Sequence, residues 1–360
     1  MPWLQSLSVR GLRVLSALEL DLGPGLNAFV GENGVGKTSI LEALSLLSRG
    51  RSFRGGNADV WIQRGLDRLQ IGASIQLTGR LHRLGLERRR QGCSARVDGE
   101  AVNGLAALAR WCPVLIFEPE THELISGASE HRRSLLHWLM FHVEPVFGER
   151  WKDYQRALQQ RNAALRGGCS DAELDGWDDI LARCGDGVSA LESAWMPRIR
   201  AAWLSAASEL LPHLGDCAFE FDRGWEAEEL RLALRHQRGR DRALGYTTQG
   251  PHRSDWMLSY ARAPRRESLS RGQQKLACIA CLVGAGALYA DHHGEPPIFA
   301  IDDLFSELDQ SHQRRVLECL QAAGVQLWVS GVETSAALAC WTGERRMFHV
   351  EQGGRVTQLI

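Results

Sequence analysis

Eight residues near the start of the chain could bind the phosphates of a nucleotide. They run from Gly31 to Thr38 and fit the pattern G-x-x-x-x-G-K-[ST], in which backbone N–H groups surround a phosphate. The lysine is informative, because the chain has 42 Lys plus Arg and only Lys37, Lys152 and Lys275 are lysines. A compact ammonium fits between the β- and γ-phosphates, whereas a planar guanidinium is too wide. The pattern therefore predicts a nucleotide-binding loop.

The loop and its flanking residues have expected roles. The cofactor-binding residues would be Gly31, Glu32, Asn33, Gly34, Val35, Gly36, Lys37, Thr38 and Ser39. The Lys37 ammonium would contact phosphate, and the Thr38 hydroxyl would be a ligand of Mg²⁺. An apolar run at 26–30 precedes the loop, and apolar residues with helical spacing follow it. This order predicts a strand, a loop and a helix whose N-terminus faces the phosphates.

Two consecutive acids follow another apolar run near the end of the chain. Residues 298–301 predict a buried parallel strand, and Asp302 and Asp303 come at its carboxyl end. Asp302 would hold Mg²⁺ directly or through water, and Asp303 would orient or deprotonate the attacking water. A single acid in this position often only caps a loop, but two acids in a chain with a phosphate loop favour catalysis. We therefore expect Lys37, Asp302 and Asp303 to be the catalytic residues.

A second candidate phosphate site lies far along the chain. Residues 269–274 match the S-x-G-Q signature of ABC-type ATPases, and 306–309 match their D-loop. A long apolar stretch follows the signature, so Ser270, Gly272 and Gln273 would bind an anion at a helix N-terminus. In ABC-type ATPases the signature of one protomer covers the γ-phosphate held by the other. The two sites together predict an ATP-dependent homodimer.

Spacing and missing motifs narrow the class of ATPase. The guanine-reading N-K-x-D element is absent, because no asparagine precedes any of the lysines, so ATP is the expected nucleotide and Mg²⁺ its metal. More than 200 residues separate Thr38 from Ser270, far more than in transporter subunits, and Ser330 stands where those subunits carry a histidine. Proline and glycine interrupt 110–260, which excludes the long coiled coil of structural SMC-like ATPases. A transporter subunit and an SMC-like structural ATPase remain the alternatives.

Composition limits the location and the partners. The formal net charge is −1, so any contact with DNA must be local. Nine scattered cysteines favour a reducing compartment, and the longest apolar run, 276–290, is shorter than a membrane span. We expect a cytoplasmic protein with no membrane partner. Candidate phosphate contacts, each more often a solvated surface, are Arg88 to Arg90, Arg132 and Arg133, Arg235, Arg238, Arg240 and Arg242, and Arg262, Arg265 and Arg266.

Over essentially its whole length the chain resembles the RecF family of bacterial recombination-repair ATPases. The matching segments are GRSFR at 50–54, FEPE at 117–120, Gly127, Arg132 and Arg133, YQRALQQRNAALR at 154–166, GPHR at 250–253, SRGQQ at 270–274, and DD at 302–303 with SELD at 306–309. The departures are Ala128-Ser129-Glu130, which lacks the usual proline, His137 in place of a common aspartate, and Ser254 in place of an acid. These departures lie outside the ATP chemistry and concern the helical lobe.

The resemblance implies a slow, DNA-dependent ATPase that dimerises with ATP. It implies binding of single-stranded and duplex DNA at gap junctions, with RecO and RecR as partners and RecA as an indirect one, in gap repair, replication restart and the SOS response. Lys37, Thr38, Asp302 and Asp303 would serve their own nucleotide, and Ser270, Gly272 and Gln273 the nucleotide of the other protomer. Arg13 matches a family arginine and either contacts the nucleotide or is a surface residue.

The motif order predicts an α/β fold. An ABC-type, SMC-head-like ATPase lobe would have mixed sheets around the phosphate-loop helix, and a compact, mainly helical second lobe would lack a long coiled coil. The phosphate-loop strand and the Asp302 strand would be neighbours in one sheet. Residues 1–115 and 276–360 would form the ATPase lobe, and 116–275 the helical lobe that ends in the signature. Alternating apolar residues at 18–22 and 69–77 predict an additional antiparallel sheet over the first helix.

Overall fold

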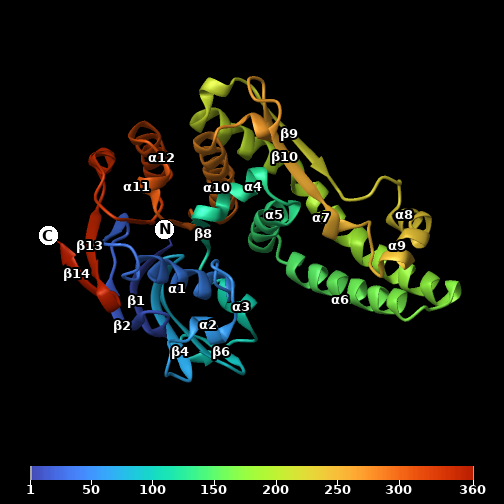
Figure 1. Cartoon of the computed structure of the whole chain (residues 1–360), viewed down its shortest axis with the longest axis horizontal. Helices are drawn as coiled ribbons and strands as arrows, with labels where there is room; N and C mark the ends of the chain where they lie inside the picture. The colour runs from blue at the N-terminus through green and yellow to red at the C-terminus, as the bar shows by residue number, and fades with distance from the viewer. Residues whose placement is uncertain (1, 360) are drawn as a thin grey trace. The chain divides into compact units, whose positions relative to one another are not determined.

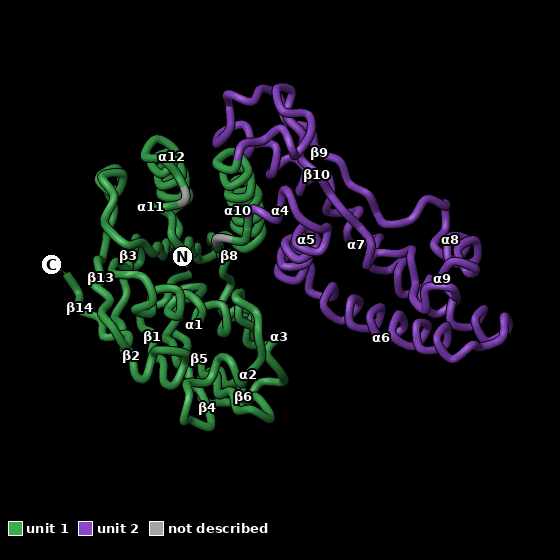
Figure 2. The backbone as a smooth tube through the Cα atoms, in the orientation of Figure 1, with its two compact units in different colours: residues 1–121, 271–360 green, residues 122–270 purple. Residues whose placement is uncertain are grey.

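The computed structural model describes residues 2–359, apart from the side chains of Pro119 and Glu307, and divides into two compact units. Unit 1 comprises Met1–Thr121 and Arg271–Ile360, and unit 2 comprises His122–Ser270 (Figure 2). The sequence-based boundaries at 115/116 and 275/276 differ from these by a few residues. The second one differs because helix α10 begins at Arg271 and belongs to unit 1 as one continuous body.

A six-stranded sheet in unit 1 carries the phosphate loop (Figure 1). All of its strands are parallel except β14, which pairs antiparallel with β13. β3, β8, β11 and β12 are buried throughout, as their unbroken apolar runs predict. The strand order is β14 (Arg355–Leu359), β13 (Arg345–Glu351), β3 (Leu26–Val30), β12 (Leu327–Gly331), β11 (Ile298–Ile301) and β8 (Val114–Phe117).

The expectation that the phosphate-loop strand and the Asp302 strand are direct neighbours is wrong. β12 lies between them, since Val329 on β12 pairs with Ala28 on β3 and with Ile301 on β11. The chain leaves β11, forms two helices and returns as β12 beside it, so the next strand in sequence takes the central place. The consequence is that Ser330, near the end of β12, comes between the phosphate loop and the two acids.

A second six-stranded sheet packs on helix α1 (Lys37–Arg49), as the alternating apolar residues predict. All its pairings are antiparallel. Its inner leucines and isoleucines form one core with Ile40, Leu41 and Leu44 of α1. The strand order is β2 (Leu15–Asp21), β1 (Trp3–Leu12), β4 (Arg68–Leu77), β5 (Arg80–Arg89), β6 (Cys93–Val97) and β7 (Glu100–Ala101). The predicted fold class, with sheets around the phosphate-loop helix, is confirmed.

The other helices of unit 1 complete its layers. α10 (Arg271–His293) packs on β8, and its Gly286 is so close to Phe299 that an added Cβ would lie 2.6 Å from the ring. Among residues 2–359, α10 alone is long and apolar enough to cross a membrane by composition, yet 67% of that apolar window is buried in the structure. The remaining helices are α2 (Ala58–Trp61), α3 (Leu105–Ala109), α11 (Leu304–Glu307), α12 (Gln310–Ala322) and short 3-10 turns at Pro119–His122, Ala336–Cys340 and Gln352–Gly354.

Unit 2 is mainly helical, as predicted. Its longest helix, α7 (Asp171–Leu210), has 40 residues, continues through Pro197 and begins with a capping box of Ser170 and Glu173. α6 (Phe147–Arg166) packs along α7, and the rest of α7 contacts short elements of the same unit, so no long coiled coil forms in the described chain (Figure 1). The other elements are α4 (Glu123–Ser126), α5 (Ser129–Val143), α8 (Leu230–His236), α9 (Arg238–Leu244), the antiparallel pair β9 (Cys217–Asp222) and β10 (Asp255–Tyr260), and 3-10 turns at Pro212–Leu214, Pro251–Arg253 and Arg266–Ser268.

Candidate nucleotide-binding site

The backbone of the phosphate loop has the shape that an anion site needs. Gly34 and Gly36 have φ angles of +82° and +123°, which side-chain-bearing residues rarely adopt. α1 begins directly after Gly36, and no described side chain caps this helix end. The N–H groups of the first turn and the positive end of the helix dipole therefore face the loop. In the loop, Glu32, Asn33 and Gly34 are exposed, whereas Gly31, Val35, Gly36 and Ser39 are buried.

The Lys37 side chain lies inside the loop. It is 6% exposed, and its Nζ donates to the carbonyl oxygens of Gly31 and Glu32, both at 2.7 Å. Burial lowers the pKa of Lys37, and the negative charges of Asp303 and Asp302 oppose that shift. A phosphate in the loop would add negative charge beside this ammonium, so binding of phosphate and protonation of Lys37 favour each other.

Thr38 and Asp302, which are 264 residues apart in sequence, meet at the carboxyl edge of the sheet. The Thr38 hydroxyl donates to Asp302 Oδ1 at 3.3 Å. Burial raises the pKa of Asp302, while hydrogen bonds from Ser330 and Thr38 and the positive charge of Arg54 lower it. Hydroxyl and carboxylate oxygens are the ligands that Mg²⁺ prefers, so this pair fits the predicted metal site.

Asp303 has different surroundings from its neighbour. Its backbone is left-handed, with φ +55° and ψ +35°, and its N–H donates to Ser330 Oγ at 2.9 Å. Its Oδ1 is buried and has no hydrogen-bond partner in the described chain. A buried carboxylate oxygen without a partner is costly. It is therefore suited to accept a hydrogen bond from a water molecule at the site.

Ser330 is a site residue that sequence reasoning did not assign. It is fully buried, and its hydroxyl donates to Asp302 Oδ1 while accepting from the N–H of Asp303. One hydroxyl thus ties the carboxylate of Asp302 and the backbone of Asp303 to β12. The only signal in the sequence was the replacement of the transporter histidine by serine at this position.

Glu118 is a third carboxyl near the site, and no role was predicted for it. It follows β8 as Asp302 follows β11; the two strands pair in parallel register, and Asp302 N–H donates to the carbonyl oxygen of Phe117 at 2.8 Å. Burial raises the pKa of Glu118 to about 7, the charge of Arg49 opposes the rise, and that of Asp302 adds to it. The acid at the end of the apolar run 114–117 could have indicated its position.

Arg13 has a structural contact that neither sequence interpretation anticipated. Its guanidinium bonds both carboxylate oxygens of Glu42 on α1, with Nε–Oε2 at 2.8 Å and Nη2–Oε1 at 2.7 Å. Glu42 is fully buried and also accepts from the Ser52 hydroxyl. Arg13 therefore ties the β1–β2 turn to the phosphate-loop helix.

The signature residues lie at the start of α10. Ser270 is exposed and is the last residue of unit 2, and Gly272 and Gln273 belong to the first turn of α10 in unit 1. An added Cβ at Gly272 would meet no atom within 4 Å. In the D-loop, Asp309 accepts from the N–H of His312 at 3.0 Å and caps α12, which lowers the pKa of Asp309 to about 2.

Several arginines proposed from sequence as phosphate contacts are bound to other groups. Arg132 is 3% exposed; its Nε and Nη2 bond Asp255 at 2.6 and 2.9 Å, so it joins α5 to β10. Arg133 donates to the carbonyl oxygen of Ser254. Arg235, Arg238 and Arg242 pair with aspartates of α7. Arg132 is thus a structural residue.

Comparisons with known proteins find relatives that match nearly the whole chain. The family model described as RecF/RecN/SMC N terminal domain matches residues 3–353. DNA replication and repair protein RecF of Stenotrophomonas maltophilia (strain R551-3) is 44% identical over 355 residues, 97% of each chain. The RecF protein of Thioalkalivibrio sulfidiphilus (strain HL-EbGR7) is 37% identical over 97% of this chain and 98% of its own.

Solved structures show the same fold at low identity. A structure of the recombination mediator protein RecF-ATPrS in the RecFOR pathway has a TM-score of 0.88 and 22% identity, and the match covers 100% of this chain and 98% of that one. An Smc head domain of Pyrococcus furiosus with an extended coiled coil has a TM-score of 0.61 and 13% identity, over 100% and 96%. The whole chain is thus similar to RecF in fold, and less closely to SMC heads.

Proposed function

The chain belongs to the RecF group of the RecF/RecN/SMC family of ABC-type ATPases, and from this premise we propose that it is an ATP-dependent DNA-binding protein of recombinational repair. The observation that carries the proposal is the meeting of Lys37, Thr38, Asp302 and Asp303 around a glycine loop at one sheet edge. Relatives named for DNA replication and repair support the biological role.

In the proposed mechanism the loop N–H groups and Lys37 hold the phosphates of ATP. Thr38 and Asp302 would hold Mg²⁺, which when bound offsets the negative charge of the phosphates. Asp303 accepts a hydrogen bond from the attacking water, orients it and takes its proton. Ser330 keeps the two acids in place, and Glu118 adds a further carboxyl close to Asp302.

Two copies of the chain would close over two ATP molecules. Each γ-phosphate would be bound by Lys37 of one copy and by Ser270, Gly272 and Gln273 of the other. ADP lacks the γ-phosphate, so hydrolysis would release the dimer and weaken its hold on DNA. The partners would be single-stranded and duplex DNA at gap junctions, RecO and RecR, with RecA loading as the result; a relative assigned to the RecFOR pathway supports this choice.

Light scattering tests the proposal directly. The protein is sized without nucleotide, with ATP and with ADP, each with and without gapped DNA, and ATP turnover is measured in the same samples. We expect a dimer only with ATP, and faster turnover with DNA. The Lys37→Arg variant is the control. Relative to the wild type, its affinity for ATP should fall less than its rate of ATP turnover. A protein that stays monomeric with ATP, or ignores DNA, would contradict the proposal.

A further inference from the structure

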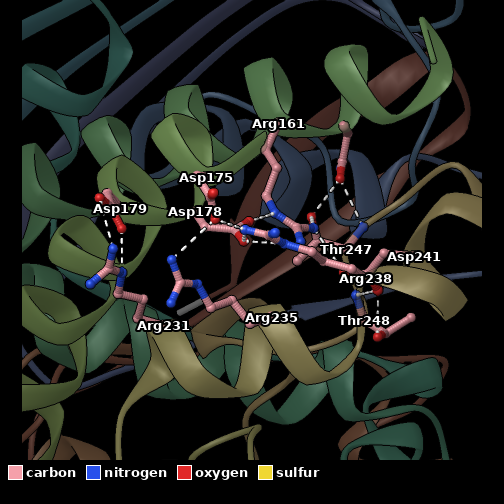
Figure 3. Close-up of polar contacts among 11 residues, drawn as sticks. Arg161, Asp175, Asp178, Asp179, Arg231, Arg235, Arg238, Asp241, Thr247 and Thr248 are labelled. Atoms are coloured by element: carbon pink, nitrogen blue, oxygen red, sulfur yellow. Dashed lines mark hydrogen bonds and ion pairs between the residues drawn. The ribbon is translucent and has the colours of Figure 1, made fainter. Parts of the chain in front are cut away.

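In unit 2, four arginines on α8 and α9 form ion pairs with aspartates on α7. Figure 3 shows three of these arginines, Arg231, Arg235 and Arg238, beside the aspartates. We call Arg231, Arg235, Arg238 and Arg242 the arginine row, and Asp171, Asp175, Asp178 and Asp179 the aspartate row. Arg231 and Arg235 are four residues apart on α8, and Arg238 and Arg242 are four residues apart on α9, so each pair lies on one face of its own helix. Their contacts are Arg231 Nη2–Asp179 Oδ2 at 3.2 Å, Arg235 Nη2–Asp175 Oδ1 at 3.1 Å, Arg238 Nε–Asp178 Oδ2 at 2.9 Å and Arg242 Nη2–Asp171 Oδ1 at 2.6 Å.

Separate, buried contacts hold α8 and α9 in place. Arg161 of α6 is fully buried, and it bonds Asp178 and Asp241 at 2.7 Å each and Thr247 at 2.8 Å (Figure 3). Asp241 of α9 is also fully buried and accepts from the N–H and the hydroxyl of Thr248. α8 in addition buries Leu230, Ala233 and Leu234. These interior contacts position the two helices independently of the outer ion pairs.

The outer ion pairs are exposed. The side chains of Asp171, Asp175 and Asp179 are 80%, 42% and 45% exposed, and Arg231, Arg235 and Arg242 are 35–44% exposed. Arg238, which also pairs with Asp175, is 18% exposed. Ion pairs with this much solvent access contribute little to stability, because water and salt screen them. Three arginines can therefore change partner while the helices stay docked, and phosphate is a ligand that a guanidinium binds at least as well as a carboxylate.

We propose that the arginine row binds the phosphate backbone of nucleic acid and that the aspartate row covers it at rest. The two arginines of each helix are about 6 Å apart along its axis, at 1.5 Å per residue, so the row suits a run of phosphates rather than one anion. The exposed aspartates Asp171, Asp175 and Asp179 are four residues apart on α7 and occupy the places of the phosphates. The inference rests on the proposed DNA binding and adds the surface that would contact DNA. Acids of the same chain offset the charge of this surface, which agrees with a net charge of −1.

The test removes the exposed acids and keeps Asp178, which also bonds Arg161. The Asp171→Asn/Asp175→Asn/Asp179→Asn variant should bind duplex DNA at least about tenfold more tightly at 0.1 M salt, and its salt slope should steepen by about 0.9 for each arginine that gains a phosphate. The matched control is Glu149→Gln/Glu209→Gln/Glu220→Gln, which removes the same charge from exposed acids of unit 2 away from the row. The control should change affinity far less.

A second set of variants assigns the gain to the row. Adding Arg231→Gln, Arg235→Gln and Arg242→Gln to the Asn variant should return the affinity to that of the wild type. The proposal would be overturned if the Asn variant and its control bound DNA with equal affinity, or if the gain in affinity survived loss of the arginines. New protease cleavage within α8–α9 would also overturn it, because unfolding of these helices would then explain the gain. Wild-type protein that binds no DNA would count against the proposed function instead, while ATP turnover without DNA should be the same in every variant.

Discussion

Asp302 and Asp303 are adjacent in sequence, yet their surroundings prepare them for different tasks. Asp302 accepts hydrogen bonds from Ser330 and Thr38, which hold its carboxylate still. Asp303 is in a left-handed conformation and has a buried Oδ1 without a partner in the described chain. A fixed carboxylate suits a metal ligand, and one with an open oxygen suits a group that receives a proton from water.

The first prediction separates these two roles. Asp303→Asn should slow hydrolysis by at least about a hundredfold, because a positioned general base is lost, and should leave ATP binding intact. Asp302→Asn should weaken Mg²⁺-dependent ATP binding. Single-turnover hydrolysis and equilibrium nucleotide binding measure the two effects. Should Asp303→Asn lose ATP binding while Asp302→Asn keeps it, the roles are reversed.

A second residue-scale prediction concerns Glu118, whose pKa burial raises to about 7. Between pH 4.5 and about 7 the unfolded chain has lost this proton and the folded protein keeps it, so stability falls as pH rises. Relative to Glu118→Gln, the free energy of unfolding of the wild type should fall by roughly 3 kcal/mol from pH 4.5 to pH 8.

Urea unfolding in the presence of EDTA, over that pH range, measures the difference. Glu120→Gln is the matched control, because Glu120 is an exposed acid two residues away. It should leave most of the wild-type pH dependence in place. Parallel curves for the wild type and Glu118→Gln would show that the pKa of Glu118 is the same in the folded and the unfolded protein.

At the scale of the elements, the Gly-Pro-His-Arg segment at 250–253 links α6 to the loop at Thr247 in unit 2. His252 Nδ1 accepts from the Tyr154 hydroxyl of α6 at 2.6 Å, and its Nε2 donates to the carbonyl oxygen of Thr247 at 3.0 Å. Burial lowers the pKa of His252 to about 4, so the ring is neutral near pH 7. At Gly250 an added Cβ would lie 2.5 Å from the Tyr154 hydroxyl. The motif therefore connects elements of one unit.

Alanine substitutions at two glycines of α7 should change the free energy of unfolding in opposite directions. At Gly185 an added Cβ would lie 2.3 Å from Leu230 Cδ2 and 3.2 Å from the Tyr154 ring, whereas at Gly187 it would meet no atom within 4 Å. Gly185→Ala should destabilise the protein by about 1–3 kcal/mol through overpacking. Gly187→Ala should stabilise it by about 0.5–1 kcal/mol, because alanine favours the helix. Thermal or urea unfolding compares them; the same sign at both positions would contradict the packing of α8 on α7.

At the scale of the whole molecule, the two proposed phosphate sites of one chain belong to two different ATP molecules. The glycine loop and the acids lie in unit 1, and the signature straddles the boundary between the units at Ser270 and Arg271. If a second copy completes each site, the bound ATP would hold the two copies together. The assembly would then be an ATP-timed clamp.

Mixing two inactive variants tests the composite site. Ser270→Arg should bind ATP as a monomer, because its phosphate loop is intact and its bulky signature blocks dimerisation; alone it should neither dimerise nor hydrolyse. Mixed with Lys37→Arg, it can form a heterodimer in which its intact phosphate loop meets the intact signature of the other chain. Partial recovery of ATP turnover is the expected result. ATP-induced dimers of Ser270→Arg alone would defeat the composite-site argument.

The sequence by itself determined the motifs, the family and the types of the main elements. Local patterns suffice for these, because an unbroken apolar run, a glycine loop and helical spacing each specify their own stretch of chain. The predicted strand at 26–30 and the acid-bearing strand at 298–301 match β3 and β11. The alternation at 69–77 lies within β4 of the second sheet.

Only the tertiary structure decided which side chains meet. In the folded chain β12 lies between β3 and β11, so Ser330 contacts Asp302 and Asp303. Arg13 pairs with Glu42, and Glu118 lies near Asp302. Arg235, Arg238 and Arg242 pair with aspartates of α7. Strand order in a parallel sheet and ion pairs between helices depend on how distant segments pack. That packing is settled by burial and by hydrogen bonds across the whole unit, so the residues next to each partner in sequence do not specify which distant side chain it meets.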